Sequence, residues 1–243
     1  MVPKKGKCKA EGLASMTAVI LAGGMGTRLC PVMADRPKVL APVRRRPFLA
    51  YLLDQLAAAD LKYVVLSTGY MGEQVHAAFG NTYGRLQLVY SQETEPLGTA
   101  GALRLTMPLL KSDPVLVMNG DSFCQVNLRN FWVWHCKLGA NATMVLVKGS
   151  NTAHYGQVDV DSDGFVTRFS EKDGTGTPGW VNAGIYLLSH SFILTIPSNG
   201  AVSLEREIFP AWIGRGLYGY PNGGHFLDIG TPEAYATAQS FFN

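Results

Sequence analysis

The chain of 243 residues is long enough for one domain, or for one domain with a small appended lobe. Hydrophobic residues make up 47% of it and aromatic residues 10%, which supports a sizeable core and argues against disorder. No apolar run approaches about 18 residues, so a transmembrane helix is not expected. The formal net charge of +3 comes from lysines near the N-terminus, and the rest of the chain is close to neutral. A nucleic-acid-binding surface is therefore not expected.

The first fifteen residues, MVPKKGKCKAEGLAS, look like an appendage. They contain four lysines and lack the apolar region that a signal peptide carries before its cleavage site. We expect residues 1–15 to be a disordered basic tail or a wrongly assigned start, and residues 16–243 to form the folded domain. The four cysteines form no C-x-x-C pair and suggest no disulfide framework, so we expect a cytoplasmic protein.

Short β-branched runs alternate with amphipathic stretches through the first half of the chain. In chain order they predict strand 17–22, helix 47–60, strand 62–67, a helix between 70 and 79, strand 85–91, helix 99–110 and strand 114–121. Repetition of strand and helix indicates a parallel sheet that is covered on both faces.

The rhythm changes after residue 140, where strand-rich segments follow one another. We predict strands over 142–148, 156–172 and 180–188. The DSDG at 161–164 predicts a hairpin turn, because it lacks the further ligand spacing and the final glutamate of a calcium loop. A helix over 231–242 closes the chain, since Thr-Pro-Glu at its start supplies an N-cap, a first-position proline and a first-turn acid.

The stretch TAVILAGGMGTRL (17–29) raises the clearest question of function, because a buried strand ends on three glycines that Arg28 follows at once. Glycines let backbone N–H groups approach a ligand, and successive N–H groups form a concavity that suits phosphate oxygens. The stretch lacks the third glycine of the dinucleotide fingerprint and the Gly-Lys-Ser/Thr of a P-loop. Arg28 and the Lys38 of RPK could neutralise a polyphosphate, although most such cations are solvated surface residues.

Seven sequence blocks, in this order, resemble those of single-domain, glycosyltransferase-A-like sugar-1-phosphate nucleotidyltransferases. They cover residues 16–241 and read LAGGMGTRL, RPK, EPLGTAGAL, NGDS, YGQV with FSEK, VNAGIYLL and FLDIGTPEAY. The resemblance implies one Rossmann-like α/β domain with a mixed, mostly parallel central sheet. It further implies a nucleotide-binding half (16–140) and a sugar-binding half (141–243). The implied reaction is attack of a sugar 1-phosphate oxygen on the α-phosphorus of an NTP, with release of pyrophosphate.

The resemblance also implies roles for residues at the matching positions. The nucleotide would be bound by Leu21, Ala22, Gly23, Gly24, Gly26, Thr27, Arg28, Lys38, Gln92, Gly98 and Thr99. The sugar phosphate would be bound by Asn119, Tyr155, Gly156, Glu171, Lys172, Asn182 and Gly184. Catalytic roles would fall to Arg28, Lys38, Asp121 and Lys172, and Mg²⁺ would be held by Asp121 and Asp228.

Simpler roles remain open for several of these residues. Asp121 could be only a turn former at a strand end, and Gln92 only a solvated strand-end residue. Glu171 and Lys172 could be an exposed charged pair, which contributes little to stability. Paired carboxylates from distant segments nevertheless suit Mg²⁺, which keeps several waters. No side chain is arranged as a nucleophile, so a direct displacement is expected.

Within the family, segments such as RPFLAYLLDQL and VSLEREIFP are most similar to D-glycero-D-manno-heptose 1-phosphate guanylyltransferases. GTP and that heptose phosphate are therefore the expected substrates, and GDP-D-glycero-D-manno-heptose is the expected product. Arg44-Arg45 departs from the Asn-Gly-type turn of relatives. The alternatives are a mannose or glucose 1-phosphate with another NTP, an inactive nucleotide-sugar sensor, or an oxidoreductase that binds a dinucleotide. The apolar segment 208–214 fits either core packing or a homodimer interface.

Overall fold

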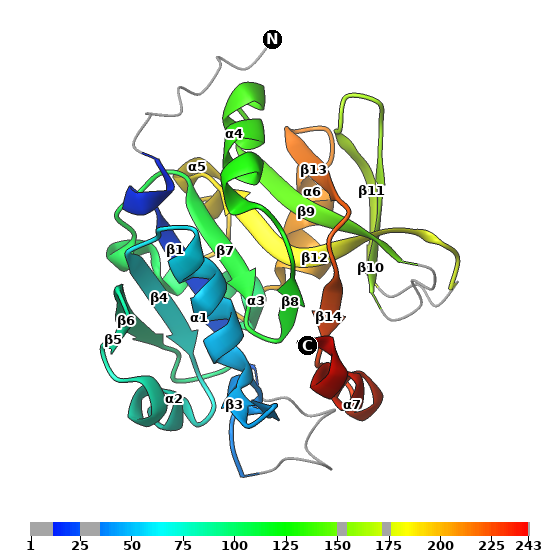
Figure 1. Ribbon diagram of the computed structural model, residues 1–243. Coiled ribbons are helices and arrows are strands. Elements are labelled where there is room, and N and C mark those ends of the chain that lie inside the picture. Colours follow the sequence, from blue (N-terminus) through cyan, green and yellow to red (C-terminus); the bar gives the residue numbers. More distant parts are fainter. Residues whose placement is uncertain (1–11, 25–34, 150–154, 172–175, 243) are drawn as a thin grey trace.

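The computed structural model describes residues 12–24, 35–149, 155–171 and 176–242 (Figure 1). Its strands are β1 (Thr17–Ala22), β2 (Pro42–Val43), β3 (Arg46–Pro47), β4 (Tyr63–Thr68), β5 (Thr82–Tyr83), β6 (Leu86–Gln92), β7 (Val115–Asn119), β8 (Ser122–Cys124), β9 (Ala142–Gly149), β10 (Gly156–Val160), β11 (Val166–Glu171), β12 (Gly179–Leu188), β13 (Leu217–Asn222) and β14 (Phe226–Asp228). Its α-helices are α1 (Phe48–Ala58), α2 (Gly72–Phe79), α3 (Gly98–Leu105), α4 (Leu128–Leu138), α5 (His190–Ile193), α6 (Phe209–Trp212) and α7 (Pro232–Phe241). Short 3₁₀ turns are η1 (Leu13–Ser15), η2 (Lys38–Leu40) and η3 (Met107–Leu109), and η4 (Leu204–Ile208) is a π-helix.

One mixed sheet forms the centre of the molecule. Its parallel part has the strand order β7-β1-β4-β6, and β5 closes that edge antiparallel to β6. On the other side β12 runs antiparallel to both β7 and β9, and β13 pairs in parallel with β9. The prediction of a single α/β domain with a mixed, mostly parallel central sheet is confirmed.

The sheet is buried on both faces, which explains why its central strands are continuously apolar. In β1, Ala18 and Ile20 pack on the face that α1 covers, whereas Val19 packs on the opposite face with α3. Successive side chains of a strand point to opposite faces, so an apolar run is needed to fill both layers. Figure 1 shows α1 and α4 in front of the sheet, with α3, α5 and α6 behind it.

Strand β12 joins the parallel part of the sheet to a branch on its far side. Its second half pairs with β7, whereas its first half pairs with β10 of the β10–β11 hairpin. The register against β9 shifts between Asn182 and Tyr186, where Gly184 has φ +73°. Because L side chains rarely adopt such a φ, glycine allows this bulge in the middle of the strand.

The strands predicted at 17–22, 62–67, 85–91 and 142–148 are confirmed to within about one residue. The predicted helix 99–110 ends earlier, at Leu105, and continues as the 3₁₀ turn η3. The expected tail boundary at residue 15 is wrong, because Leu13 lies in η1 and packs into the core. Apolar burial explains this difference, and residues 1–11 lie outside the described ranges.

The two cysteines in the described part of the chain differ in state. Cys124 is free and buried, whereas Cys136 is disulfide-bonded, so the expectation of no disulfide is wrong at Cys136. Across the described ranges, no helix has the length and apolar character needed to cross a membrane.

Candidate active site

A cavity of about 870 Å³ opens at the carboxyl ends of the parallel strands, where open α/β sheets bind ligands. It brings together all the predicted site residues whose side chains the structure describes: Leu21, Ala22, Gly23, Gly24, Lys38, Gln92, Gly98, Thr99, Asn119, Asp121, Tyr155, Gly156, Asn182, Gly184 and Asp228. Gly26, Thr27, Arg28 and Lys172 lie outside the described residues, as does the side chain of Glu171. The roles of all these residues stay predictions.

Two glycines lie side by side where β1 and β4 end. Gly23 and Gly69 follow a parallel pair whose last partners are Ala22 and Thr68. A Cβ on Gly69 would come within 2.9 Å of the Gly23 carbonyl oxygen, and a Cβ on Gly23 within 2.5 Å of Glu93 Oε1. Close packing against backbone therefore favours glycine at position 69, whereas a side chain at position 23 would displace the end of Glu93. Gly24 has open space instead, which leaves its backbone accessible from the cavity.

Glu93 is a cavity residue that the sequence analysis missed. It follows Gln92 at the end of β6, and its Oε2 accepts a hydrogen bond of 3.2 Å from the Leu97 backbone N–H. Burial raises the pKa of the Glu93 carboxyl. Among the described residues no lysine or arginine forms an ion pair with it. A carboxylate in a site built for phosphates must face the donor groups of the ligand, because it would repel the phosphates.

Two aspartates from distant parts of the chain meet through a short antiparallel ladder. Strand β14 pairs with β8 so that Asp228 lies opposite Ser122, the residue after Asp121. The Ile229 N–H also donates to the Asp121 carbonyl oxygen at 2.9 Å. Both aspartate side chains consequently line the same end of the cavity.

Among the described residues, Lys38 supplies a positive charge at this end of the cavity. Its Nζ lies 2.7 Å from Asp121 Oδ2, and only 10% of the lysine side chain is exposed, against 43% for the aspartate. A Cβ on Gly230 would lie 3.3 Å from Lys38 Nζ and 2.7 Å from Asp228 Oδ1, so the amine and the second carboxylate flank one glycine. Lys38 opens η2 directly after Pro37, whose fixed φ defines where the side chain starts.

The donor set fits Mg²⁺ better than a caged metal. The described residues contain no cluster of three or more histidine, cysteine or acidic side chains that could surround an ion. A structural zinc site normally needs four such ligands. Mg²⁺ retains several waters and needs only one or two carboxylates, which Asp121 and Asp228 provide.

The opposite wall of the cavity is formed around the bulge in β12. A Cβ on Gly184 would lie 2.7 Å from Ser122 Oγ and 3.0 Å from the Asn119 Cβ, so glycine lets β12 approach β7 and β8 closely. The Asn182 Oδ1 accepts a hydrogen bond of 3.1 Å from the Gly184 N–H. Asn119 Oδ1 is buried and has no hydrogen-bond partner among the described residues, so a ligand hydroxyl could satisfy it.

Tyr155 lies in the same wall of the cavity, and its neutral hydroxyl can donate a hydrogen bond. Burial raises the pKa of its hydroxyl, and the charge of Asp228 raises it further. Its ring packs edge-on against Phe226, with centroids 5.5 Å apart. The hydroxyl therefore keeps its proton at neutral pH and can donate to an oxygen.

Comparison with known proteins places these features in one family. The chain matches the nucleotidyl transferase family over residues 17–243. It is 34% identical to D-glycero-alpha-D-manno-heptose 1-phosphate guanylyltransferase of Aneurinibacillus thermoaerophilus, over 92% of this chain and 97% of that one. It is 36% identical to mannose-1-phosphate guanylyltransferase of Mycobacterium tuberculosis over 90% of this chain, which spans only 62% of that relative.

A solved structure agrees with the sequence matches. The crystal structure of HddC from Yersinia pseudotuberculosis, complexed with GMP-PN, superposes with a TM-score of 0.82 at 29% sequence identity. The superposition covers 94% of this chain and the whole of that one. The order of the strands, the cavity at their carboxyl ends and the match along nearly the whole chain lead to one conclusion. The chain belongs to the nucleotidyl transferase family.

Proposed function

We propose that this chain transfers a nucleotidyl group from an NTP to a sugar 1-phosphate. We propose GTP and D-glycero-D-manno-heptose 1-phosphate as the substrates, and the GDP-heptose and pyrophosphate as the products. The relative that supports this choice is matched over 97% of its own length. A sugar phosphate oxygen would form a new bond to the α-phosphorus while the bond to the bridging oxygen breaks. The electron pair leaves with pyrophosphate.

The observation that carries the proposal is the position of Lys38 between Asp121 and the Asp228 turn. This cluster lies where the glycine-lined end of the cavity meets the β12 wall. A nucleotide on one side and a sugar phosphate on the other would therefore bring their phosphates together at these three side chains. Nucleotidyl transfer needs little covalent work from the protein, so positioning and charge neutralisation provide most of the catalysis.

On the nucleotide side, the chain would hold the phosphates with backbone groups at the end of β1. Gly24 is open to the cavity, and its neighbour Gly23 is packed in place by Glu93. Lys38 would then balance charge on the α-phosphate, where an amine within a partly dry site has its strongest effect. Its present partner Asp121 keeps the amine oriented towards the same point.

Asp121 and Asp228 would hold Mg²⁺ with waters completing its coordination. When bound, Mg²⁺ would act as a Lewis acid on phosphate oxygens and orient the two substrates. On the sugar side, the Tyr155 hydroxyl and the buried Asn119 Oδ1 would serve as donor and acceptor for sugar hydroxyls. Removal of Mg²⁺ with a chelator is then expected to abolish turnover, and its return to restore it.

We propose that Glu93 selects guanine. Guanine presents two adjacent donors, N1–H and the N2 amino group, which a carboxylate can accept together. Glu93 is fixed by the Leu97 N–H and is not neutralised by a cation in the described part of the chain. Gln92 also lines the cavity beside it, as the sequence predicted, and its role in base reading stays a prediction.

The first alternative keeps the reaction and changes the sugar to mannose 1-phosphate, which the Mycobacterium tuberculosis relative favours. The second alternative is a sensor that binds the nucleotide without turnover. The aspartate pair and Lys38 argue against this second alternative, because a sensor has no need for them. A homodimer also stays a prediction, which light scattering in solution would test.

Pyrophosphate release tests the proposal directly. Each common NTP is offered with heptose, mannose and glucose 1-phosphates in the presence of Mg²⁺. Release from GTP with heptose 1-phosphate is expected, and Asp121→Asn is expected to abolish it. Asp60→Asn is the matched control, because Asp60 is an exposed residue that tolerates the change at φ +65°. Release with mannose 1-phosphate alone would favour the first alternative, and nucleotide binding without release would favour the sensor.

A further inference from the structure

Glu205 links the two sides of the cavity, and the sequence analysis assigned it no role although it lies in the VSLEREIFP segment. It lies in the π-helix η4 and lines the cavity. Its Oε2 accepts a hydrogen bond of 2.7 Å from Thr99 Oγ1, which is in the first turn of α3 on the nucleotide side. Its Oε1 faces the Tyr186 hydroxyl of β12 at 3.5 Å, on the sugar side. One carboxylate thus contacts both walls of the cavity. We call the side lined by Gly23, Gly24, Glu93, Gly98 and Thr99 the nucleotide wall, and the side lined by Asn119, Tyr155, Asn182 and Gly184 the sugar wall.

The hydrogen bonds continue from Tyr186 into the bulge of β12. The Tyr186 hydroxyl accepts from Asn182 Nδ2 at 2.8 Å, and Asn182 Oδ1 accepts from the Gly184 N–H. Tyr186 is fully buried, so this part of the chain has little freedom to rearrange separately. A continuous path of polar contacts therefore leads from Thr99 to Gly184 by way of Glu205.

The start of α3 is tied to the same segment by its backbone. The Val202 carbonyl oxygen accepts from the Ala100 N–H at 2.9 Å, and the Leu204 N–H donates to Thr99 Oγ1 at 2.9 Å. Gly98 has φ +70°, and a Cβ there would overlap the Val202 carbonyl oxygen. Any shift of the Gly98–Thr99 turn on nucleotide binding must consequently be transmitted to η4.

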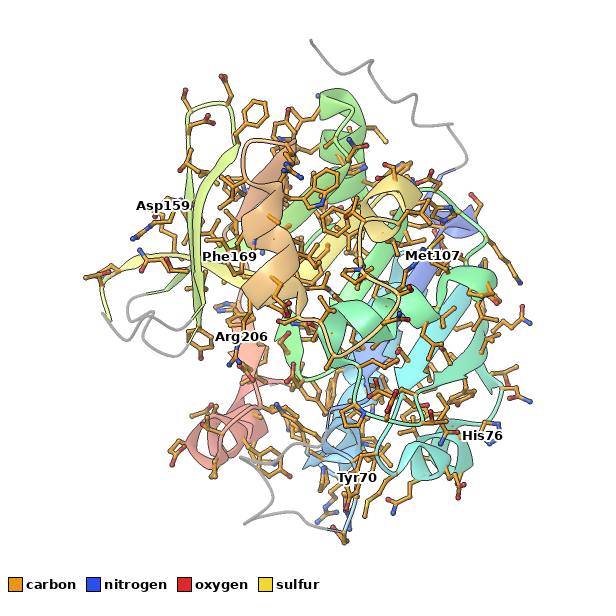
Figure 2. All side chains as sticks on the ribbon, turned by 180° about the vertical axis from the view of Figure 1, so that it is seen from behind. Tyr70, His76, Met107, Asp159, Phe169 and Arg206 are labelled. Carbon is orange, nitrogen blue, oxygen red and sulfur yellow. The ribbon has the colours of Figure 1, made fainter. Side chains whose placement is uncertain are left out.

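The π-helix itself explains why Glu205 points into the site. The five residues of η4 place Glu205 towards the cavity and Glu207 at the cap, where Glu207 Oε1 accepts from the Ser203 N–H at 2.8 Å. In Figure 2 Arg206, the residue between them, lies at the end of the helical segment that leads into α6. Single-turn π-helices are frequent at functional sites.

We propose that Glu205 is a positioning residue that couples the nucleotide wall to the sugar wall. Binding of the nucleotide at Gly98 and Thr99 fixes the Glu205 carboxylate, which fixes Tyr186 and hence the bulge at Asn182 and Gly184. The sugar pocket is thereby completed only when the nucleotide is present. This inference rests on the proposed function for the identity of the second substrate, but its test needs only the nucleotide.

Hydrogen–deuterium exchange of the full chain tests this coupling, with the α,β-methylene analogue of GTP as the probe. In the wild type, the analogue is expected to slow amide exchange in β12 by about fivefold or more, since allosteric coupling of a few RT has that size. In Glu205→Gln the slowing is expected to be lost, because an amide nitrogen cannot accept the hydroxyl bonds that the carboxylate accepts. In the matched control Glu207→Gln, in the same π-helix, the slowing is expected to remain.

Tyr186→Phe provides a second, nearly isosteric variant in case Glu205→Gln fails to fold. It breaks the path on the sugar side only, so the analogue should still bind while β12 no longer responds. No slowing in the wild type, or slowing that persists in Glu205→Gln, would overturn the proposal. A merely structural Glu205 would lower the melting temperature and leave the response of β12 intact.

The same experiment separates this proposal from the proposed function. If the analogue slows exchange in β12 but no substrate pair releases pyrophosphate, the coupling proposal is retained and the proposed function is rejected. If pyrophosphate is released but exchange in β12 does not respond to the analogue, the proposed function is retained and the coupling proposal is rejected. A chain that fails to bind the analogue would overturn both.

Discussion

The two halves of the cavity are built by different means. On the nucleotide side, parallel strands β1 and β4 end together and present backbone at Gly23, Gly24 and Gly69. On the sugar side, β12 runs antiparallel to its neighbours and is interrupted in its middle by the bulge, where Asn182 and the buried Gly184 line the cavity. Parallel strands all end at the same edge of the sheet, so their carboxyl ends meet there directly. An antiparallel strand offers a polar site in its middle only where a bulge interrupts the hydrogen bonds to its neighbours.

The difference extends to the groups that contact ligands. The nucleotide wall offers backbone amides and acidic side chains such as Glu93, while the sugar wall offers amide and phenol side chains such as Asn119 and Tyr155. Backbone amides suit any triphosphate, so selectivity on that side depends on few residues, Glu93 among them. Under the proposed function the sugar wall would instead distinguish its ligand through the positions of several side chains. The two walls should therefore respond differently to mutation.

The largest effect is expected where the two walls meet. Lys38→Met removes the amine between the two aspartates and is expected to lower kcat by about 10²–10³-fold, as loss of a key electrostatic contact does. In the proposed reaction the amine serves both substrates at the reacting phosphorus, so kcat should fall more than either KM rises. Steady-state kinetics measure this, with the exposed Lys62→Met as the control. Retention of kcat would place the reacting phosphorus elsewhere.

A matched pair of glycines tests whether the walls are separable. Gly98→Ala is expected to raise the KM for the nucleotide most, and Gly184→Ala the KM for the sugar phosphate most, because each glycine packs within one wall while Glu205 couples the two. Each change also strains a residue of positive φ, at a cost of about 1–2 kcal/mol. Calorimetric melting should show a loss of roughly 2–4 °C per kcal/mol.

Gly200→Ala is the control for this pair. Gly200 also has a positive φ, of +83°, but nothing lies within 4 Å of a Cβ there. It should therefore show the strain alone, with a lower melting temperature and unchanged KM values. If Gly98→Ala and Gly184→Ala raised both KM values equally, the walls would act as one unit.

Glu93→Gln sharpens the comparison on the nucleotide side. It should weaken selection for GTP over ATP by about tenfold, since one contact to a base is worth roughly 1–3 kcal/mol. The raised pKa of Glu93 also predicts a pH effect. As the pH falls through this pKa the carboxylate gains a proton and loses its acceptor capacity, so the KM for GTP should rise. The KM of Glu93→Gln should lack this dependence.

The raised pKa of Glu93 also affects the stability of the fold. Lowering the pH should weaken GTP binding, but it should increase the contribution of Glu93 to stability. A carboxyl whose pKa is higher in the folded state than in the unfolded state binds protons more tightly when folded. Glu93 therefore opposes folding above its raised pKa and stops doing so as the pH falls towards its unfolded value. Glu93→Gln should remove this contribution, which urea unfolding at several pH values would detect.

The smallest effect is expected far from either wall. Arg168→Ala removes the ion pair with Asp159 on the β10–β11 hairpin, where both side chains are about half exposed. Exposed pairs contribute at most about 1 kcal/mol, so urea unfolding should change little and the kinetic constants should not change. A clear change in the KM for the sugar phosphate would mean that the hairpin position, and not only the bulge, shapes the sugar wall.

Much of the nucleotide wall could be predicted from the sequence, because its signals are local. A β-branched run followed by glycines is visible in one short window, and β1 appears where it was predicted. The sequence also holds the signals of helix α4, which was not predicted. Asn127 caps its start, and Gly139 ends it with φ +59°. These are signals that reach only a few residues along the chain.

The other parts of the site could not be predicted from short stretches of the sequence. Strands β8 and β14 have three residues each and exist only because they pair with one another. Glu93 and Glu205 are ordinary acids in sequence, and only tertiary contacts place them in the cavity. The resemblance to a family identified the two aspartates, but the ladder that joins them depends on pairing between distant segments.

The ladder of β8 and β14 also has a consequence for how the protein is made. Asp121 and Asp228 are about a hundred residues apart in the chain, and contacts of such separation form late in folding. During synthesis the nucleotide wall can assemble once the segment 202–205, which anchors the start of α3, has emerged from the ribosome. The aspartate pair can form only after residue 228 has emerged. Nascent chains should therefore retain GTP before they can turn it over.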